Sequence, residues 1–187
     1  GWRQVDVRWA DDVHRVFTGH TTIDGHDLDG PLRKLRYEQH LSANSQEGRP
    51  ASFTSVIDAG GGQREIQARR TGTTWTVSVT DGGNSRMHSL PHTRVDLSSV
   101  DLMDPEAERR LTGRAHAAIL LSETGKIEEG AVQNLGEKAL SIGGETMLTQ
   151  ELAWTTSQGV YRFWYAQNGW LVRWQAPILG LQVLGEL

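Results

Sequence analysis

Histidine side chains are the first groups in this chain that could hold a metal ion, and there are seven of them. His14, His20 and His26 are spaced by six residues, an even interval that would place all three on one face of an unbroken strand. Gly19 and the Asp24-Gly25 pair interrupt such a strand, and no His-Glu-x-x-His sequence is present. We therefore expect scattered surface or turn histidines, with no metal site and no cofactor.

Three aspartates interleaved with glycines at residues 24–30 look at first like a calcium-binding loop. With Gly30 as the sixth residue of an EF-hand loop, position one would be Gly25 and position twelve would be Arg36, where acidic side chains are required. The register fails, and Asp-Gly pairs are ordinary turn chemistry. A looser cation site is the minor alternative.

Motifs for covalent or acid–base catalysis are weak. No serine stands in the Gly-x-Ser-x-Gly frame of a hydrolase nucleophile. The acidic pairs Asp101/Asp104 and Glu128/Glu129 fall in a helix lead-in and in a turn, where we expect solvated carboxylates. We name no catalytic residue, although an active site assembled from distant strands stays open.

Two aromatic-rich runs flank Asn168-Gly169. Asn-Gly supplies the positive φ angles of a type I′ turn, so the segment predicts a β-hairpin with a two-residue loop. In that register Phe163 lies opposite Trp174, and Tyr165 lies opposite Val172. An aromatic wall of this size must be buried in a core or offered to an apolar ligand.

Two arginines lie on the other face of this hairpin, and Arg173 falls opposite Trp164, close enough for the guanidinium to stack on the indole. A structural cation–π pair is the simpler interpretation. The alternative is that Arg162 and Arg173 mark the rim of a pocket and meet the carboxylate or phosphate of an amphipathic ligand.

Composition limits the class of protein. A net charge of −4 and a pI near 6.0 give no general attraction to nucleic acid, which we do not expect as a partner. No cysteine is present, so disulfides and thiolate metal sites are excluded. Apolar runs are far shorter than the ~20 residues that span a bilayer. Because Gly1 and Trp2 begin the chain without a methionine, we expect that a signal peptide or a cleaved tag has been removed, and we favour the signal peptide.

A helix signal stands in the middle of the chain. Asp104 suits the N-cap, Pro105 the first helical position, and Gly113 the position after the end. Residues 115–122 fit a second short helix or a buried strand, and we favour the strand. Most other segments predict strands, with a polar loop over 42–50. The expected strands fall at 13–17, 32–41, 53–57, 63–70, 73–80, 132–142, 145–155, 161–166, 171–176 and 178–187.

About ten antiparallel strands in meander order make the chain mostly β. We expect a strongly curved antiparallel sheet or incomplete β-barrel, covered by one or two short helices. At 187 residues we expect a single domain over 1–187. Residues 1–12 are expected to be an N-terminal extension, for which flexibility is allowed.

Four segments spread over most of the chain resemble a group of poorly characterised bacterial exported proteins related to the LolA/LolB-like lipoprotein-carrier superfamily. The resemblance implies a curved antiparallel sheet whose concave side holds apolar material, outside the cytoplasm, and it implies no catalytic residues. The chain has no lipobox cysteine and so would not itself be a lipoprotein. The matching segments are Val95 to Pro105, Leu121 to Glu128, Leu135 to Gly144 and Phe163 to Arg173.

The sequence thus favours a non-catalytic periplasmic or extracellular binding protein for a lipid or other hydrophobic ligand. The alternative is a structural or accessory subunit of a larger cell-envelope or extracellular assembly, with other envelope proteins as partners. A lipid- or saccharide-acting enzyme comes third. The expected ligand-binding residues are Trp75, Val77, Val79, Leu152, Trp154, Phe163, Tyr165, Trp174, Arg162 and Arg173.

Overall fold

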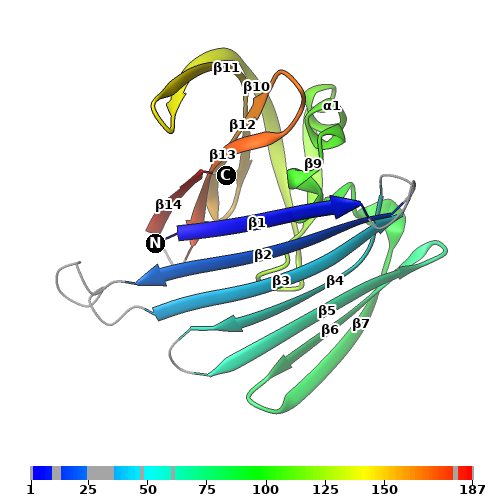
Figure 1. Ribbon diagram of the computed structural model, residues 1–187. Helices are drawn as coiled ribbons and strands as arrows, with labels where there is room; N and C mark the ends of the chain where they lie inside the picture. Colours follow the sequence, from blue (N-terminus) through cyan, green and yellow to red (C-terminus); the bar gives the residue numbers. More distant parts are fainter. Residues whose placement is uncertain are drawn as a thin grey trace. The chain divides into compact units, whose positions relative to one another are not determined.

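The computed structural model describes residues 2–9, 14–24, 36–46, 49–59, 62–178 and 181–186. The chain divides into unit 1, Gly1–Val95 with Leu121–Lys126, and unit 2, Asp96–Leu120 with Ile127–Leu187. Each unit is built on one seven-stranded sheet (Figure 1). Whether the chain is one domain stays a prediction.

Unit 1 is an antiparallel meander in which every strand pairs with the next one along the chain. Short turns join several of these strands. Gly72, with φ of +57°, occupies the two-residue loop between the fifth and sixth strands, which begins one residue later than the expected gap at 71–72. The strands are β1 (Trp2–Trp9), β2 (His14–Asp24), β3 (Arg36–Gln46), β4 (Arg49–Asp58), β5 (Gln63–Thr71), β6 (Thr74–Asp81) and β7 (Asn84–Pro91).

Two sequence-based expectations for unit 1 need correction. Residues 42–50 were expected to form a polar loop, but β3 and β4 run through most of this range and pair with each other. Alternation explains this, because Ala43 is buried while Ser42 and Asn44 lie on the solvent side, so small polar residues here form the outer face of a strand. The segment 1–12, set apart as an extension, contains β1, which pairs with β2 along its length.

One face of the unit 1 sheet is apolar. Alternate residues of β4 and β6 are buried, including Phe53, Ile57, Trp75 and Val77, as the period of two in these segments predicts. Leu121–Lys126 folds into a turn closed by hydrogen bonds from Leu121 N to Lys126 O and from Gly125 N to Leu121 O. The sheet therefore has one dry face and one wet face.

Unit 2 contains a second sheet, with the strand order β14-β13-β12-β11-β10-β9-β8. All neighbours are antiparallel except β8 and β9, which run parallel. Residues 116–120 are a strand, as favoured above. The strands are β8 (Leu97–Ser98), β9 (His116–Leu120), β10 (Ile127–Ile142), β11 (Glu145–Thr156), β12 (Gly159–Ala166), β13 (Leu171–Ile178) and β14 (Leu181–Glu186).

The β12–β13 hairpin differs by one residue from its prediction. Phe163 pairs with Trp174 and Trp164 with Arg173, as expected, but Tyr165 pairs with Leu171. Ala166 N donates to Trp170 O and Gly169 N donates to Ala166 O, so the loop has three residues, with Gly169 at a φ of +83°. This is the common type I turn with a following left-handed residue, and its extra residue causes the register shift.

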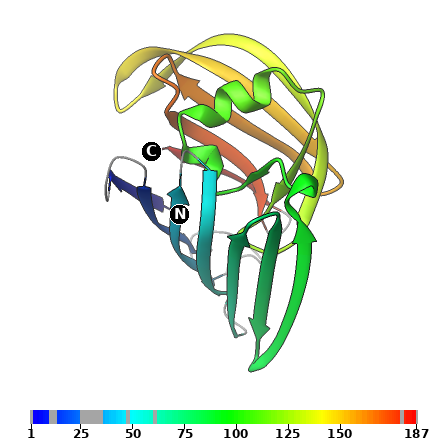
Figure 2. The ribbon, with the colours of Figure 1, turned by 90° about the vertical axis from the view of Figure 1, so that its right-hand side faces the viewer.

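Helix α1 (Glu106–Thr112) follows a short 3₁₀ turn at Asp101–Met103. Asp104 Oδ1 accepts a hydrogen bond of 2.9 Å from Glu106 N, which is the predicted N-cap contact, and Gly113 follows the last helical residue. Ala107 and Leu111 are buried, so one side of α1 is apolar and packs against the unit 2 sheet. The strands of this sheet arch over the helix (Figure 2).

The chain is thus mostly β, with strongly curved antiparallel sheets and one short helix, which confirms the predicted fold class. The described residues contain fourteen strands rather than about ten. Across those same residues, no helix has both the length and the apolar character needed to cross a membrane.

Candidate functional site

An aromatic wall lies on one face of β11, β12 and β13 in unit 2. Cross-strand register places its members side by side, since Leu152 pairs with Phe163, Phe163 pairs with Trp174, and Trp154 pairs with Tyr161. Five of the predicted ligand-binding residues lie on this face, and the exposed fraction of each is between 0 and 4%. We define the aromatic wall as Leu152, Trp154, Phe163, Tyr165 and Trp174.

The segment from Val100 to Leu111 packs onto this sheet, and its Leu102, Met103 and Leu111 are buried. Tyr165 fixes it in place, because its hydroxyl donates a hydrogen bond of 3.1 Å to Leu102 O. Burial of this hydroxyl raises the pKa of Tyr165 well above its ordinary value, so the group is a neutral donor. We call residues 100–112 the cover segment.

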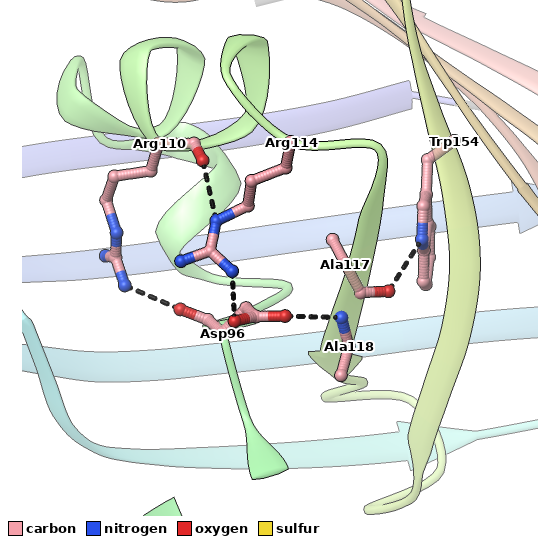
Figure 3. A network of polar contacts seen from close by, with 6 residues as sticks. All are labelled: Asp96, Arg110, Arg114, Ala117, Ala118 and Trp154. Atoms are coloured by element: carbon pink, nitrogen blue, oxygen red, sulfur yellow. Dashed lines mark hydrogen bonds and ion pairs between the residues drawn. The ribbon is translucent and has the colours of Figure 1, made fainter. Parts of the chain in front are cut away.

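Trp154, another member of the aromatic wall, contacts β9 (Figure 3). Its indole Nε1 donates a hydrogen bond of 3.2 Å to Ala117 O in β9. The indole also lies against Gly130, where a Cβ atom would come within 2.6 Å of Nε1 and 2.5 Å of Thr155 O. Glycine at position 130 therefore makes room for the indole, which sequence reasoning did not anticipate.

Asp96 joins the cover segment to the sheet (Figure 3). Its carboxylate pairs with Arg114 and accepts a hydrogen bond of 2.8 Å from Ala118 N, while Arg110 donates to its backbone oxygen at 2.6 Å. Arg114 Nε in turn donates to Arg110 O at 3.0 Å. Arg110 thus helps to hold the C-terminal end of α1 against β9.

The predicted solvated acids of the cover segment are buried. Asp101 and Asp104 are each 4% exposed, because the sheet packs over the turn that carries them. Burial raises the pKa of Asp101 to about 7, although hydrogen bonds from Ser98 N, at 2.5 Å, and Ser98 Oγ, at 3.1 Å, and the charge of Arg110 act in the opposite direction. The expectation of solvated carboxylates is therefore wrong for this pair.

The two predicted rim arginines have acidic partners in unit 2. Arg162 pairs with Glu151 Oε1, and Arg173 pairs with Glu186 and donates a hydrogen bond of 3.0 Å to Ser141 O. Trp164 lies opposite Arg173 in the register, as predicted. The carboxylates of Glu151 and Glu186 thus pair with these arginines inside the unit, and a role of the arginines in ligand binding stays a prediction.

The other three predicted lining residues belong to unit 1. Trp75 and Val77 are buried and Val79 is partly buried. Gly125 lies against this strand, because a Cβ atom on it would come within 2.8 Å of Val79 Cγ2 and 3.1 Å of Val77 Cγ1. The turn at Leu121–Lys126 therefore covers part of the apolar face that was expected to receive a ligand.

A buried polar contact accompanies this turn. Gln39 Nε2 donates to Ser55 Oγ at 2.8 Å and to Ser122 Oγ at 3.4 Å. All three side chains are at most 3% exposed, and mutual hydrogen bonding offsets the cost of burying them.

A cluster of ionisable groups lies on the wet face of the unit 1 sheet. His20 in β2 pairs directly with His40 in β3, and their rings stack with centroids 4.3 Å apart. Both Nε2 atoms approach Glu38 Oε1, at 3.0 Å from His20 and 2.9 Å from His40. Hydrogen bonding to His40 and then to His20 lowers the pKa of Glu38.

Sequence reasoning missed this cluster because it compared His20 with His14 and His26. Residue 26 and the aspartates at 27 and 29 lie outside the described residues. The signal that could have found it is spacing in the sequence, since His20 and His40 lie at equal distances from Gly30, a residue type that favours turns. A hairpin centred there pairs the two histidines.

Comparison with known proteins gives the fold and no activity. No family model and no curated protein matches the chain. A solved structure, described as a beta-barrel-like protein of the domain of unknown function DUF1849 from Brucella abortus, is similar with a TM-score of 0.66 at 9% sequence identity. The match covers 99% of this chain and 85% of that one. It supports a beta-barrel-like fold.

Proposed function

We propose that this chain is a non-catalytic binding protein for a lipid or other hydrophobic ligand, which it receives on the aromatic wall of unit 2. The observation that carries the proposal is the pairing of a broad apolar wall with a short, separate cover segment. Ligand entry requires this segment to move away from the wall, and its length and attachments decide whether that is feasible.

The cover segment depends on its packing. Helix α1 has seven residues, whereas isolated helices shorter than about 12–15 residues are marginal in water. Polar contacts also hold it, including those from Tyr165 to Leu102 O and from Arg110 to Asp96 O. Displacement would break these contacts and would expose an apolar face, and a ligand that covers this face could return about 25 cal/mol for each Å² covered.

The polar groups of the unit support binding more than catalysis. Asp101 and Tyr165, whose pKa values are raised most among the described residues, are buried and hydrogen-bonded to the chain itself. Perturbed groups in an active site would instead face an open cleft where a substrate can reach them. Carboxylates also neutralise the nearby arginines.

A periplasmic or extracellular location belongs to this proposal. Its support is the resemblance to exported lipoprotein-carrier relatives, together with a cysteine-free, tryptophan-rich composition that suits a secreted β protein. Fractionation of the source cells, followed by immunoblotting, tests this part independently of ligand binding.

The binding test uses cis-parinaric acid, a fluorescent fatty acid that accepts energy from tryptophan. The full chain, stripped of lipid by organic extraction and refolded, is titrated beside two variants. Phe163→Ala shortens a wall residue that is 3% exposed, whereas Leu184→Ser changes a side chain on β14 that is 58% exposed. We expect saturable energy transfer in the wild type and in Leu184→Ser, and an affinity at least about ten-fold weaker in Phe163→Ala.

Non-saturable binding, or equal weakening in both variants, would contradict a site at the wall. Equal binding in all three proteins would place the fatty acid on another surface. Native mass spectrometry of protein isolated from its own organism adds a second readout, since a co-purifying apolar molecule is expected there.

A second function, that of an accessory subunit in a larger assembly, is favoured by a different observation. Strands β7 and β14 are the terminal strands of their sheets, and they carry the exposed apolar side chains Met87, 73% exposed, and Leu184. Terminal strands can pair with a partner chain. If a partner protein co-purifies with the wild type and is lost from Leu184→Ser or Met87→Ser, the accessory-subunit function is favoured over ligand binding.

A further inference from the structure

The wet face of the unit 1 sheet brings three potential metal ligands together on two adjacent strands. Glu38 and His40 are two residues apart in β3, so they share a face, and Gln39 between them is buried on the opposite face. His20 joins them because it is the direct cross-strand partner of His40. The ligand atoms of all three lie within 4.8 Å of one another.

We propose that His20, Glu38 and His40 form a binding site for a divalent transition metal ion such as Zn²⁺, held by two imidazole Nε2 atoms and one carboxylate oxygen. Imidazole suits zinc, copper and nickel, and two imidazoles with one carboxylate are a known zinc ligand set. This site is separate from the aromatic wall and does not depend on the function proposed for it.

The distances require a modest adjustment. Zinc lies about 2.0–2.2 Å from nitrogen and oxygen ligands, so two ligands of one tetrahedral ion are about 3.3 Å apart. The separations from Glu38 Oε1 are 3.0 Å to His20 and 2.9 Å to His40, so the carboxylate needs to retreat by a few tenths of an ångström.

The imidazoles must also turn. Their rings are nearly parallel, with 13° between the planes, whereas an ion approaches each Nε2 atom in the plane of its ring. Rotation about χ2, a soft torsion, splays the rings toward a common point. The side chains of Glu38 and His40 are 49% and 60% exposed, so solvent surrounds their movement. The His20 side chain is 29% exposed and contacts Thr22 Oγ1 at 3.4 Å, so His40 and Glu38 make the larger part of the adjustment.

An ion at this position would join β2 to β3 across the sheet and leave a coordination position for water. Because it would bind the folded chain and not the separated strands, it would also stabilise the fold according to its concentration. Metal affinity and thermal stability are therefore two linked measurements of one site.

The test is a calorimetric titration of the tag-free full chain with Zn²⁺, after treatment with a chelator and buffer exchange. The variants His20→Asn, His40→Asn and Glu38→Gln each remove one ligand. His88→Asn, an exposed histidine in β7 of the same unit, is the matched control. We expect one ion per wild-type chain, at least ten-fold weaker binding in each histidine variant and unchanged binding in His88→Asn.

Two further readouts keep the test decisive if a variant folds poorly. Zn²⁺ should raise the melting temperature of the wild type and of His88→Asn but not that of His40→Asn. The electron paramagnetic resonance spectrum of Cu²⁺ bound to the wild type should show two nitrogen ligands. No binding by the wild type, or wild-type affinity in a double His20→Asn/His40→Asn variant, would overturn the proposal.

Discussion

Arg173 in β13 donates a hydrogen bond of 3.0 Å to the backbone oxygen of Ser141 in β10, although β11 and β12 lie between these two strands in the sheet. The distal part of the β10–β11 hairpin must therefore bend back over the face that carries Arg173. Glu186 pairs with the same guanidinium. One side chain thus links three strands of the unit 2 sheet and maintains its curvature.

Replacement of Arg173 by alanine should loosen this bend. The substitution removes the hydrogen bond to Ser141 O and leaves Glu186 without this cation, at a cost of about 1–2 kcal/mol in the free energy of unfolding. Amide exchange should rise in residues 138–148. Arg86→Ala, on an exposed strand position of unit 1, is the control and should change stability by less than about 0.5 kcal/mol. Equal exchange in both variants would contradict the bend.

Replacement of Tyr165 by phenylalanine should release the cover segment. The ring still fills the wall, but the Leu102 carbonyl loses its buried donor, which costs about 1–3 kcal/mol. We expect faster amide exchange over residues 100–112 and, if the wall binds ligand, faster association of cis-parinaric acid. Unchanged exchange in this segment would show that apolar packing alone holds it.

Replacement of Asp101 by asparagine should stabilise the protein, and more so as the pH rises. The folded-state pKa of about 7 exceeds the ordinary value of 3.8, so the folded chain binds more protons than the unfolded chain between these values. Burial of the carboxyl group therefore costs stability increasingly from about pH 4 to pH 7, with an upper limit on the order of 4 kcal/mol.

Denaturant unfolding of wild type and Asp101→Asn at pH 4, 6 and 8 measures this difference. Asparagine carries no charge and can still accept a hydrogen bond from Ser98 N. The advantage of the variant should grow with each step and level off above pH 7. A difference that is constant across the three pH values would contradict the shifted pKa.

Replacement of Gly130 by alanine should displace the Trp154 indole. The added Cβ atom would lie 2.6 Å from Trp154 Nε1 and 2.5 Å from Thr155 O, and backbone cannot move as easily as the end of a side chain. We expect a loss of about 2 kcal/mol or more and a change in tryptophan fluorescence. Gly113→Ala is the control, because open space surrounds that position and its φ is −88°. A similar loss at both positions would mean that packing around Trp154 is not the cause.

The predictions that the structure confirms rest on short-range patterns. Asp104, Pro105 and Gly113 mark the ends of α1 because capping is a local exchange of hydrogen bonds. Strict alternation from Thr74 to Thr80 predicts a half-buried strand because successive side chains point to opposite faces. The predicted curved sheet with a short helix follows from such segments in series.

The burial of side chains and the pairing of residues across strands could not be predicted from such short-range patterns. Asp101 belongs to a helix lead-in that looks solvated, and only the sheet that packs over it makes it buried. A one-residue difference in the β12–β13 loop moves the partner of Tyr165 from Val172 to Leu171, although Asn168-Gly169 correctly marks the turn. Loop length, rather than the identity of the turn residues, sets the register.

The sequence by itself determined the secondary-structure class, the main turns and the helix ends, because these depend on residues within a few positions of one another. Only the tertiary structure decided that His20 meets His40 beside Glu38, that Arg173 reaches Ser141, and that residues 100–112 cover the aromatic wall. The physical reason is that strand pairing and sheet curvature join residues far apart in the chain, and their geometry depends on every turn and bulge between them.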